Sequence, residues 1–354
     1  MSDKLRKATI LPLLLAAAGS GAVAHEPERS SAPLERARIE DVEPQSAAAP
    51  VAESRWVGPY RLLRELGTGG MGTVHLAESS GPRPRRVALK LIREGPGASE
   101  LVRQFEVERR ALAVADHDFV ARLYDSGTAS DGRPWIAMEY VAGEPLTDYC
   151  DRRSLDVEAR LRLFIDVCAA VGHLHERGVL HRDLKPANVL VSERRGQPVV
   201  KLIDLGLAQV HGLERDEAEG LVGTPAYMAP EQFTLGSHEL TARGDVFALG
   251  VVLRELLVGA RLPSPAHGGM LDAALRSLAP ENPPPSAQLG TLESASSVAR
   301  RRSTRVARLR RRLRGTLDRI AQRACASRPE ARYPSASALA LDLERDVRRH
   351  AAWR

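Results

Sequence analysis

The chain of 354 residues is long enough for one large domain or two ordinary ones, and 43% of its residues are hydrophobic, so it can bury a sizeable core. Its formal net charge of +6 is modest for this length and rests mainly on arginine, because the only lysines are Lys4, Lys7, Lys90, Lys185 and Lys201. The cysteines, Cys150, Cys168 and Cys325, are odd in number and far apart, which excludes a disulfide framework or a zinc-site spacing and indicates a reducing compartment.

Residues 1–24 form a signal-like or anchor-like apolar leader. Basic residues precede an apolar run, 8–18, that Pro12 interrupts, and Ala-Val-Ala at 22–24 resembles a signal-peptidase site. The run is short for a membrane span, so a cleaved signal, a weak anchor and an unstructured leader all remain open. Residues 25–54 are rich in Glu, Pro, Ser and Ala and predict a disordered linker.

A glycine-rich stretch, 67–72, follows the first predicted strand, 60–63, and has the spacing G-x-G-x-x-G. Dinucleotide-binding folds share this spacing, but there the glycines lead into a helix. Here residues 73–77 alternate and predict a strand. The pattern therefore favours a hairpin whose backbone N–H groups can approach phosphate oxygens, although an ordinary hairpin turn has the same signature.

A second apolar strand, 87–92, contains Lys90. A lysine in such a strand needs a partner, because an unpaired buried charge is costly, unless its ammonium group reaches water at the strand end. The predicted helix 101–114 offers Glu106 and Glu108 as partners.

Downstream, residues 135–141 predict a strand that runs into a polar turn, and apolar residues recur at helical spacing from 156 to 176. The stretch His181–Asn188 then lies between two apolar runs and reads His-Arg-Asp-Leu-Lys-Pro-Ala-Asn. Such a loop suits phosphoryl transfer. Asp183 can accept a proton from a hydroxyl, Lys185 can offset phosphate charge, and Asn188 can offer an oxygen to Mg²⁺. A further apolar strand ends in Asp204, a natural Mg²⁺ ligand.

These segments, in this order, resemble the protein kinase family, whose catalytic loop reads H-R-D-L-x-x-x-N. The Lys-Pro pair at 185–186 is the form of the Ser/Thr branch, Val-Ala-Leu-Lys at 87–90 is similar to the V-A-I-K element, and Ala-Pro-Glu at 229–231 matches the A-P-E ending. The chain is identified as similar to bacterial eukaryotic-like Ser/Thr protein kinases.

The resemblance implies an α+β, two-lobed kinase domain over residues 55–350. A small antiparallel sheet with one main helix would form the N-lobe, 56–141, and a larger, mainly helical C-lobe would span 142–350. Residues 260–298, rich in Pro, Gly and Ser, predict a mobile insertion. The arginine run 300–314 and the apolar stripe through it predict an amphipathic helix with a solvated basic face, a docking patch for acidic partners or nucleic acid being the alternative.

Site roles follow from the same resemblance. Asp183, Lys185, Lys90 and Glu108 would be catalytic, with Glu108 preferred over Glu106 for its place before His117, where the family usually has a His-Pro pair. Asn188 and Asp204 would hold the metal. Nucleotide contacts fall on Gly67, Thr68, Gly69, Gly70, Met71, Gly72, Val74, Ala88, Lys90, Met138, Glu139, Val141 and Leu190.

Supporting roles are implied for residues further along. Asp245 would anchor the catalytic loop, Arg332 would pair with Glu231, and Thr224 would lie near Asp183 and Lys185. Segment 207–222 contains no Ser, Thr or Tyr that could carry a phosphate. Its carboxylates form either a solvated loop or a charge-assisted contact with Arg182. The four carboxylates in question are Glu214, Asp216, Glu217 and Glu219.

The expected activity is ATP-dependent transfer of the γ-phosphoryl group to Ser or Thr hydroxyls of a protein substrate, with ATP and Mg²⁺ as cofactors and no nucleic-acid partner. This chemistry needs cytosolic nucleotide, so a cytoplasmic location is expected, with inner-membrane attachment through residues 8–24 as an option. A catalytically silent scaffold of the same fold is the alternative, favoured only by the leader, the missing phosphosite and Leu205 in place of the usual Phe. A dinucleotide-binding oxidoreductase rests on the glycine spacing alone.

Overall fold

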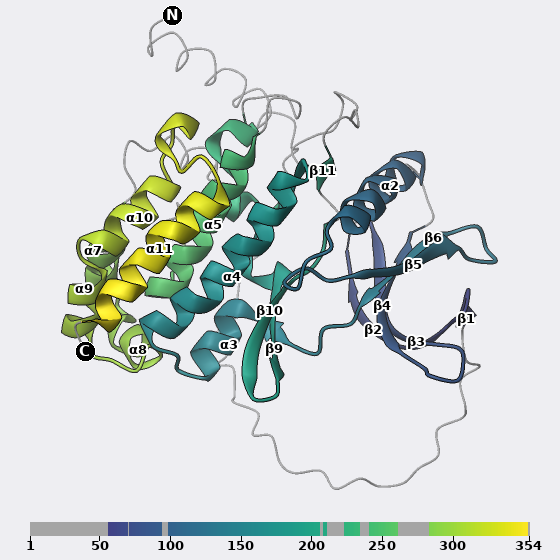
Figure 1. Cartoon of the computed structure of the whole chain (residues 1–354), viewed down its shortest axis with the longest axis horizontal. Coiled ribbons are helices and arrows are strands. Elements are labelled where there is room, and N and C mark those ends of the chain that lie inside the picture. Colours follow the sequence, from purple (N-terminus) through teal and green to yellow (C-terminus); the bar gives the residue numbers. More distant parts are fainter. Residues whose placement is uncertain are drawn as a thin grey trace, which may run out of the picture. The chain divides into compact units, whose positions relative to one another are not determined.

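The computed structural model describes residues 56–69, 71–93, 98–205, 208–210, 223–233, 241–260 and 283–352, all within a compact unit, Trp56–Arg354 (Figure 1). The leader 1–24, the linker 25–54, Gly70, Gly206 and most of segment 207–222 lie outside the described residues.

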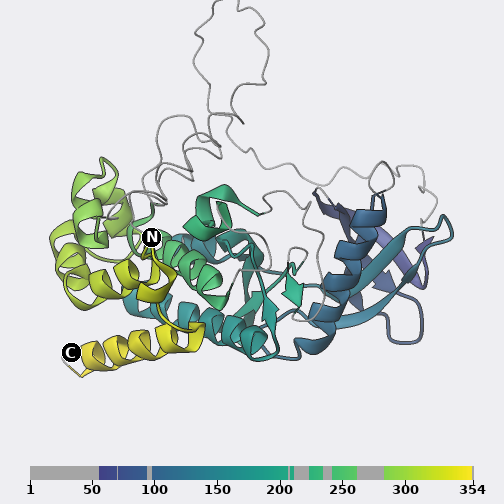
Figure 2. The same ribbon diagram turned by 90° about the horizontal axis from the view of Figure 1, so that it is seen from above.

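The first part of this unit is a six-stranded antiparallel sheet in the order β1-β2-β3-β4-β6-β5. Its strands are β1 (Trp56–Val57), β2 (Tyr60–Thr68), β3 (Gly72–Ser79), β4 (Arg86–Ile92), β5 (Leu123–Thr128) and β6 (Pro134–Glu139). Helix α2 (Ala98–Val114) lies alongside it (Figure 2). Tyr60 and Trp135 meet edge to face inside this sheet, with ring centroids 5.4 Å apart, and anchor its smaller core.

The glycine-rich stretch is the turn of the β2–β3 hairpin, and no helix follows it, because β3 runs directly into its pairing with β4. The amide of Gly69 donates to the carbonyl of Gly72 at 2.9 Å, which closes the turn. A Cβ at Gly72 would lie 2.1 Å from the carbonyl oxygen of Leu91, so this position of the hairpin excludes any side chain.

The second part is mainly helical. Its helices are α3 (Leu146–Arg152), α4 (Val157–Glu176), α5 (Ala242–Val258), α7 (Pro285–Thr291), α8 (Ala295–Arg300), α9 (Val306–Leu313), α10 (Thr316–Ala324) and α11 (Ala336–Ala351). Small antiparallel pairings accompany them: β10 (Gln197–Leu202), β9 (Val189–Arg194) and β7 (Glu144–Pro145) form one sheet, and β8 (Val179–Leu180) pairs with β11 (Gln209–Val210). The predicted α+β architecture, an antiparallel sheet with one main helix followed by a helical part, is confirmed.

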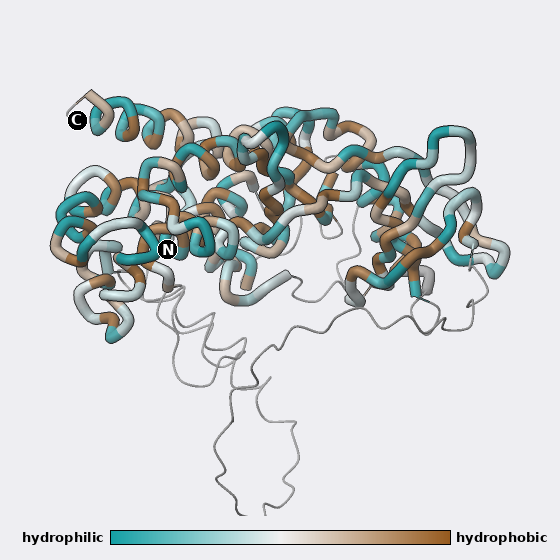
Figure 3. Tube along the Cα trace, turned by 90° about the horizontal axis from the view of Figure 1, so that it is seen from below, coloured by the Kyte–Doolittle hydropathy of each residue, from teal (hydrophilic) through white to brown (hydrophobic). Residues whose placement is uncertain are grey.

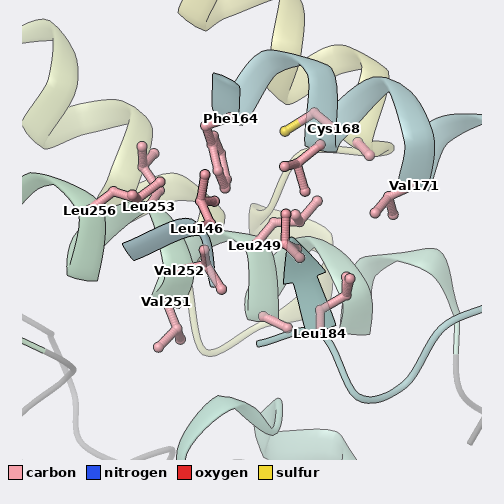
Figure 4. Packing of buried hydrophobic residues seen from close by; sticks show 14 of the residues in the cluster. Leu146, Phe164, Cys168, Val171, Leu184, Leu249, Val251, Val252, Leu253 and Leu256 are labelled. Carbon is pink, nitrogen blue, oxygen red and sulfur yellow. The ribbon is translucent and has the colours of Figure 1, made fainter. Parts of the chain in front are cut away.

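The main core lies between α4 and α5. Phe164 and Cys168 of α4 face Leu249 and Val252 of α5 (Figure 4). Asp156 caps α4 by accepting from the amide of Ala159. Hydrophobic positions concentrate in the middle of the helical part, whereas α11 alternates between polar and apolar positions (Figure 3). Cys168 is fully buried, and burial raises the pKa of its thiol, so it acts as a core residue.

Two sequence expectations for the C-terminal third are corrected. Part of the expected mobile insertion, 260–298, forms α7 and most of α8, while residues 261–282 lie outside the described ones. The arginine run is not one helix with the stripe that follows it, because α9 ends at Leu313 and α10 begins after Gly315, whose φ is 94°. A positive φ of this size is left-handed and interrupts a helix.

Within the described residues, no helix is long and apolar enough to cross a membrane. The expectation of an inner-membrane attachment is not supported by this finding. The segment on which it was placed, 8–24, lies outside the described residues.

Candidate active site

The loop 181–188 is anchored by one buried carboxylate. Asp245, in the first turn of α5, accepts hydrogen bonds from the backbone amides of His181 at 2.8 Å and Arg182 at 2.9 Å. His175, at the end of α4, lies 2.8 Å from the same carboxylate. Burial raises the pKa of Asp245, but His175 and the amide donors outweigh it, so the pKa is lowered and the carboxylate stays charged. These bonds fix the direction in which the loop leaves β8. Arg182 adopts a left-handed backbone conformation there, with a φ of 68°.

Asp183 lies next in the loop with only 8% of its surface exposed. One carboxylate oxygen, Oδ1, accepts from the amide of Thr224 at 2.9 Å and from its hydroxyl at 2.8 Å. The other, Oδ2, accepts from the ammonium group of Lys185 at 2.6 Å and from the side-chain amide nitrogen of Asn188 at 3.2 Å. Lys185 also donates to the hydroxyl of Thr224 at 2.9 Å. The structure thus brings Asp183, Lys185 and Asn188 of the loop together with Thr224, whose place near Asp183 and Lys185 the sequence predicted.

The ammonium group of Lys90 contacts carboxylates from two different parts of the chain. Its ammonium group lies 2.7 Å from Oε2 of Glu108 on α2 and 3.4 Å from Oδ1 of Asp204, which follows β10. Glu106 instead bonds to Arg109 at the surface, which separates the two candidate partners. Burial alone lowers the pKa of Lys90, but Glu108 and Asp204 outweigh it and raise the pKa above its ordinary value. Lys90 is therefore charged at any physiological pH.

Asp204 occupies a conformation that few side chains adopt. Its φ is 63°, in the left-handed region, and 48% of its side chain is exposed although it contacts the buried Lys90. Such a conformation costs of order 1–3 kcal/mol and occurs mostly at functional sites. The backbone here directs the carboxylate toward the sheet and leaves part of it open to a ligand.

The residues assigned to nucleotide contacts come from five strands, β2, β3, β4, β6 and β9, and the connections beside them. Ala88 on β4 and Met138 on β6 are partners in register, as are Val74 on β3 and Lys90. Leu190 lies on β9, and Val141 follows β6. Of these six residues, Met138 and Lys90 are buried, and the other four are intermediate in exposure.

In the hairpin turn, the hydroxyl of Thr68 bonds to Glu65 and Thr73, and the carbonyl of Met71 accepts from Arg93. A Cβ added at Gly67 or Gly69 would meet no atom within 4 Å, so the backbone of both glycines is open on that side. Gly70, between them and Gly72, is outside the described residues.

Lys201 is a residue that sequence reasoning left without a role. It is 4% exposed on β10, and its ammonium group lies 2.7 Å from Oε2 of Glu139, at the end of β6. It also donates to the carbonyl of Val120 at 3.2 Å. The signal was present in the sequence, because a lysine inside an apolar strand needs a buried partner. The carboxylate of Glu139 is thereby committed to Lys201 and Arg194, which leaves its backbone for any nucleotide contact.

Two longer-range expectations concern the stretch between Asp204 and the Ala-Pro-Glu ending at 229–231. Arg332 forms a bidentate pair with Glu231, with nitrogen–oxygen distances of 2.6 and 2.7 Å, as predicted. The proposed contact between Arg182 and an acidic residue at 214–219 falls on residues outside the described ones.

Comparison with known proteins agrees with this geometry. Residues 60–324 match the family described as protein kinase domain. The serine/threonine-protein kinase Pkn1 of Myxococcus xanthus is 34% identical over 299 residues, which are 83% of this chain and 39% of that protein. PknB of Mycobacterium tuberculosis is 30% identical over 299 residues, 81% of this chain and 42% of that protein. The chain thus spans less than half the length of these two relatives.

The crystal structure of the Mycobacterium tuberculosis PknI kinase domain superposes with a TM-score of 0.57 at 25% identity, covering 84% of this chain and 100% of that one. The predicted resemblance to bacterial Ser/Thr kinases is confirmed at the level of family. The chain therefore belongs to the protein kinase domain family, whose members use ATP, usually with a divalent metal ion, and act on proteins.

Proposed function

We propose that this chain is an ATP-dependent kinase that transfers the γ-phosphoryl group to Ser or Thr hydroxyls of proteins. The observation that carries the proposal is the meeting of Lys90, Glu108 and Asp204, which come from β4, α2 and the end of β10. These charged groups would bind a metal-chelated triphosphate, and the same fold presents Asp183 and Lys185 in the loop after β8.

Asp183 is the group proposed to orient the acceptor hydroxyl and receive its proton. Its carboxylate is held by the four donors already described, so its rotamer is defined before a substrate arrives. The hydroxyl of Thr224, which now donates to Asp183 at 2.8 Å, occupies the position of an alcohol donor. An acceptor hydroxyl of the substrate would use the same oxygen in the same manner, and Lys185 would offset charge on the moving phosphoryl group.

Asn188 and Asp204 are the residues proposed to hold Mg²⁺. Asn188 donates through its amide nitrogen to the carbonyl and carboxylate of Asp183, which leaves its amide oxygen as the acceptor. Asp204 adds a half-exposed carboxylate. Both offer hard oxygen ligands, the set that Mg²⁺ prefers, so the residues fit the ion. A bound Mg²⁺ would supply charge neutralisation at the phosphates.

Lys90, held by Glu108, would position the α- and β-phosphates, and the open backbone of Gly67 and Gly69 would cover them. Ala88, Met138, Val141 and Leu190 would line the adenine site, and the backbone from Glu139 to Val141 would pair with its edge. The scaffold alternative has no observation in its favour, because each residue that the transfer requires is present in the chain.

The test is incubation of the full-length protein with radiolabelled ATP, Mg²⁺ and acceptor peptides that differ only in carrying Ser, Thr or Tyr. Transfer to Ser and Thr is expected, and Asp183→Asn should reduce it by at least about 10²-fold. The matched control is Asp148→Asn, an exposed carboxylate on α3, which should leave the rate unchanged. An Asp183→Asn protein that labels peptide as fast as wild type rejects the proposal in favour of a scaffold.

A further inference from the structure

A hollow of about 620 Å³ lies where the start of α4, the connection between α8 and α9, helix α9 and the end of α11 come together. It is lined by Glu158 of α4, Arg308, Arg311 and Arg312 of α9, and His350 of α11. Val157 and Leu309 also line it but are almost fully buried, with 4% and 0% exposed. The accessible border of the hollow is thus mainly basic.

The basic residues of this hollow differ in whether a carboxylate lies against them. Arg312 lies 2.7 Å from Glu158 and also pairs with Asp346, and His350 lies 3.3 Å from Glu158. Arg308 and Arg311 are exposed and form no ion pair with any residue in the part of the chain that the structure describes. They add two uncompensated charges at the border of the hollow, whereas the paired Arg312 is fixed in position between its two carboxylates.

We propose that this hollow binds an acidic segment of the protein substrate, with Asp or Glu side chains against Arg308 and Arg311. The inference rests on the proposed function, because it assigns the substrate of a protein kinase a second contact. Guanidinium groups bind carboxylates in a bidentate manner, so two uncompensated arginines suit an acidic peptide.

Nucleic acid fits this hollow less well. Asp156 and Glu158 line it together with the arginines, and they would repel an uninterrupted row of phosphates. Spaced carboxylates on a peptide can contact Arg308 and Arg311 while avoiding those two residues.

The distance from the hollow to Asp183 determines how many residues must separate the acidic segment of the substrate from its acceptor hydroxyl. Helix α4 begins at the hollow and ends at His175, next to the Asp245 that anchors the loop of Asp183. Its 20 residues span about 30 Å. An extended peptide covers ~3.3–3.6 Å per residue, so at least about nine residues must separate the acidic segment from the acceptor hydroxyl.

Binding is tested with the full-length protein and a fluorescein-labelled peptide of alternating Glu and Leu that contains no Ser, Thr or Tyr. Fluorescence anisotropy should show saturable binding that weakens as NaCl rises. The variant Arg308→Glu/Arg311→Glu should bind about tenfold more weakly or worse. The matched control, Arg83→Glu/Arg314→Glu, changes two exposed arginines outside the hollow by the same charge and should bind as wild type does.

Three results overturn the inference. The first is equal peptide affinity in wild type and Arg308→Glu/Arg311→Glu, and the second is tighter binding of a single-stranded oligonucleotide than of the peptide. The third is peptide binding that begins only after Glu40, Asp41 and Glu43 are changed to amides, because the chain's own N-terminal segment would then be the occupant.

A second measurement separates this inference from the proposed function. Acceptor peptides joined to the acidic segment by linkers of four or fifteen residues are phosphorylated by wild type and by Arg308→Glu/Arg311→Glu. Only the long linker should lower KM, and only in wild type, while a short acceptor without the segment should react equally with both proteins. Equal KM values for the long and short linkers reject the docking site even when phosphorylation itself is observed.

Discussion

Lys201 and Glu139 form a buried ion pair, with 2.7 Å between Nζ and Oε2, that joins β10 of the helical part to β6 of the N-terminal sheet. Their side chains are 5% and 10% exposed. The pair lies at the end of β6, where the chain leaves the sheet for α3, and Arg194 adds a second cation 2.9 Å from Glu139. The connection between the two parts is therefore held by side chains as well as by the backbone.

Replacing Lys201 by Met should lower the free energy of unfolding by about 3 kcal/mol, because Glu139 would keep a buried charge with the exposed Arg194 and the backbone amide of Arg122 as partners. Urea denaturation followed by circular dichroism measures the change. The double variant Lys201→Met/Glu139→Gln removes the charge as well and should recover much of the loss. Single and double variants of equal stability would show that the pair does not act as a unit.

Alanine substitution of the glycines in the β2–β3 hairpin should have two different effects, depending on the space around each glycine. Gly72→Ala should destabilise the protein by about 2 kcal/mol, because its Cβ would lie 2.1 Å from the Leu91 carbonyl oxygen. Gly69→Ala meets no atom within 4 Å and should change stability by less than about 0.5 kcal/mol. Its Cβ should still obstruct phosphate approach and raise KM for ATP. Thermal denaturation and initial rates test both effects, and a stable Gly72→Ala protein would contradict the register of β3 against β4.

Arg332→Lys should be strongly destabilising although it preserves the charge. Arg332 contacts both oxygens of Glu231 and donates to the carbonyls of Ala326, Ser327 and Arg243. An ammonium group cannot reproduce this fork of bonds, and a loss of about 3 kcal/mol is expected from urea denaturation. The control is Arg345→Lys in an exposed pair with Asp342, for which less than about 0.5 kcal/mol is expected. Equal losses would contradict the importance of the bidentate geometry.

Acid should destabilise the protein in part through His181. Burial lowers the pKa of this fully buried imidazole, against the opposing effect of Asp245, Asp204 and Asp183. Below pH ~6.5 the unfolded chain binds a proton at this residue that the folded chain does not. Its contribution to stability is thus complete above pH ~6.5 and is lost as the pH falls through the lower folded-state pKa.

Urea denaturation of wild type and His181→Asn at pH 7.5 and 5.5 measures this dependence. The variant, which cannot titrate at this position, should lose less stability between the two pH values than wild type loses. The difference cannot exceed about 1.4 kcal/mol per pH unit for a single proton. Identical pH dependence in the two proteins would assign the effect to other histidines, of which His117 and His173 also have lowered pKa values because of burial.

Local patterns predicted the elements well where one segment contains all the information. The alternation after the glycines predicted a hairpin, and β2 and β3 form it. Helical spacing predicted a helix at 156–176, and α4 spans Val157–Glu176. Of the apolar stripe Val306, Leu309, Leu313, Leu317 and Ile320, all but the partly buried Val306 are buried, yet the helix breaks at Gly315. Periodicity identifies the face that is buried, but a break between two helices that bury the same residues leaves no mark on the period.

By itself, the sequence determined the order of the motifs and the residue types that phosphoryl transfer requires, because those depend on adjacent positions along the chain. The tertiary structure showed Glu108, already preferred over Glu106, at Lys90; it alone decided Glu139 for Lys201; and it put the hydroxyl of Thr224, expected nearby, on the carboxylate of Asp183. These pairs are separated by 18, 62 and 41 residues. Side chains so far apart meet only when packing brings their elements together, and the cost of an unpaired buried charge then selects which of them remain in contact.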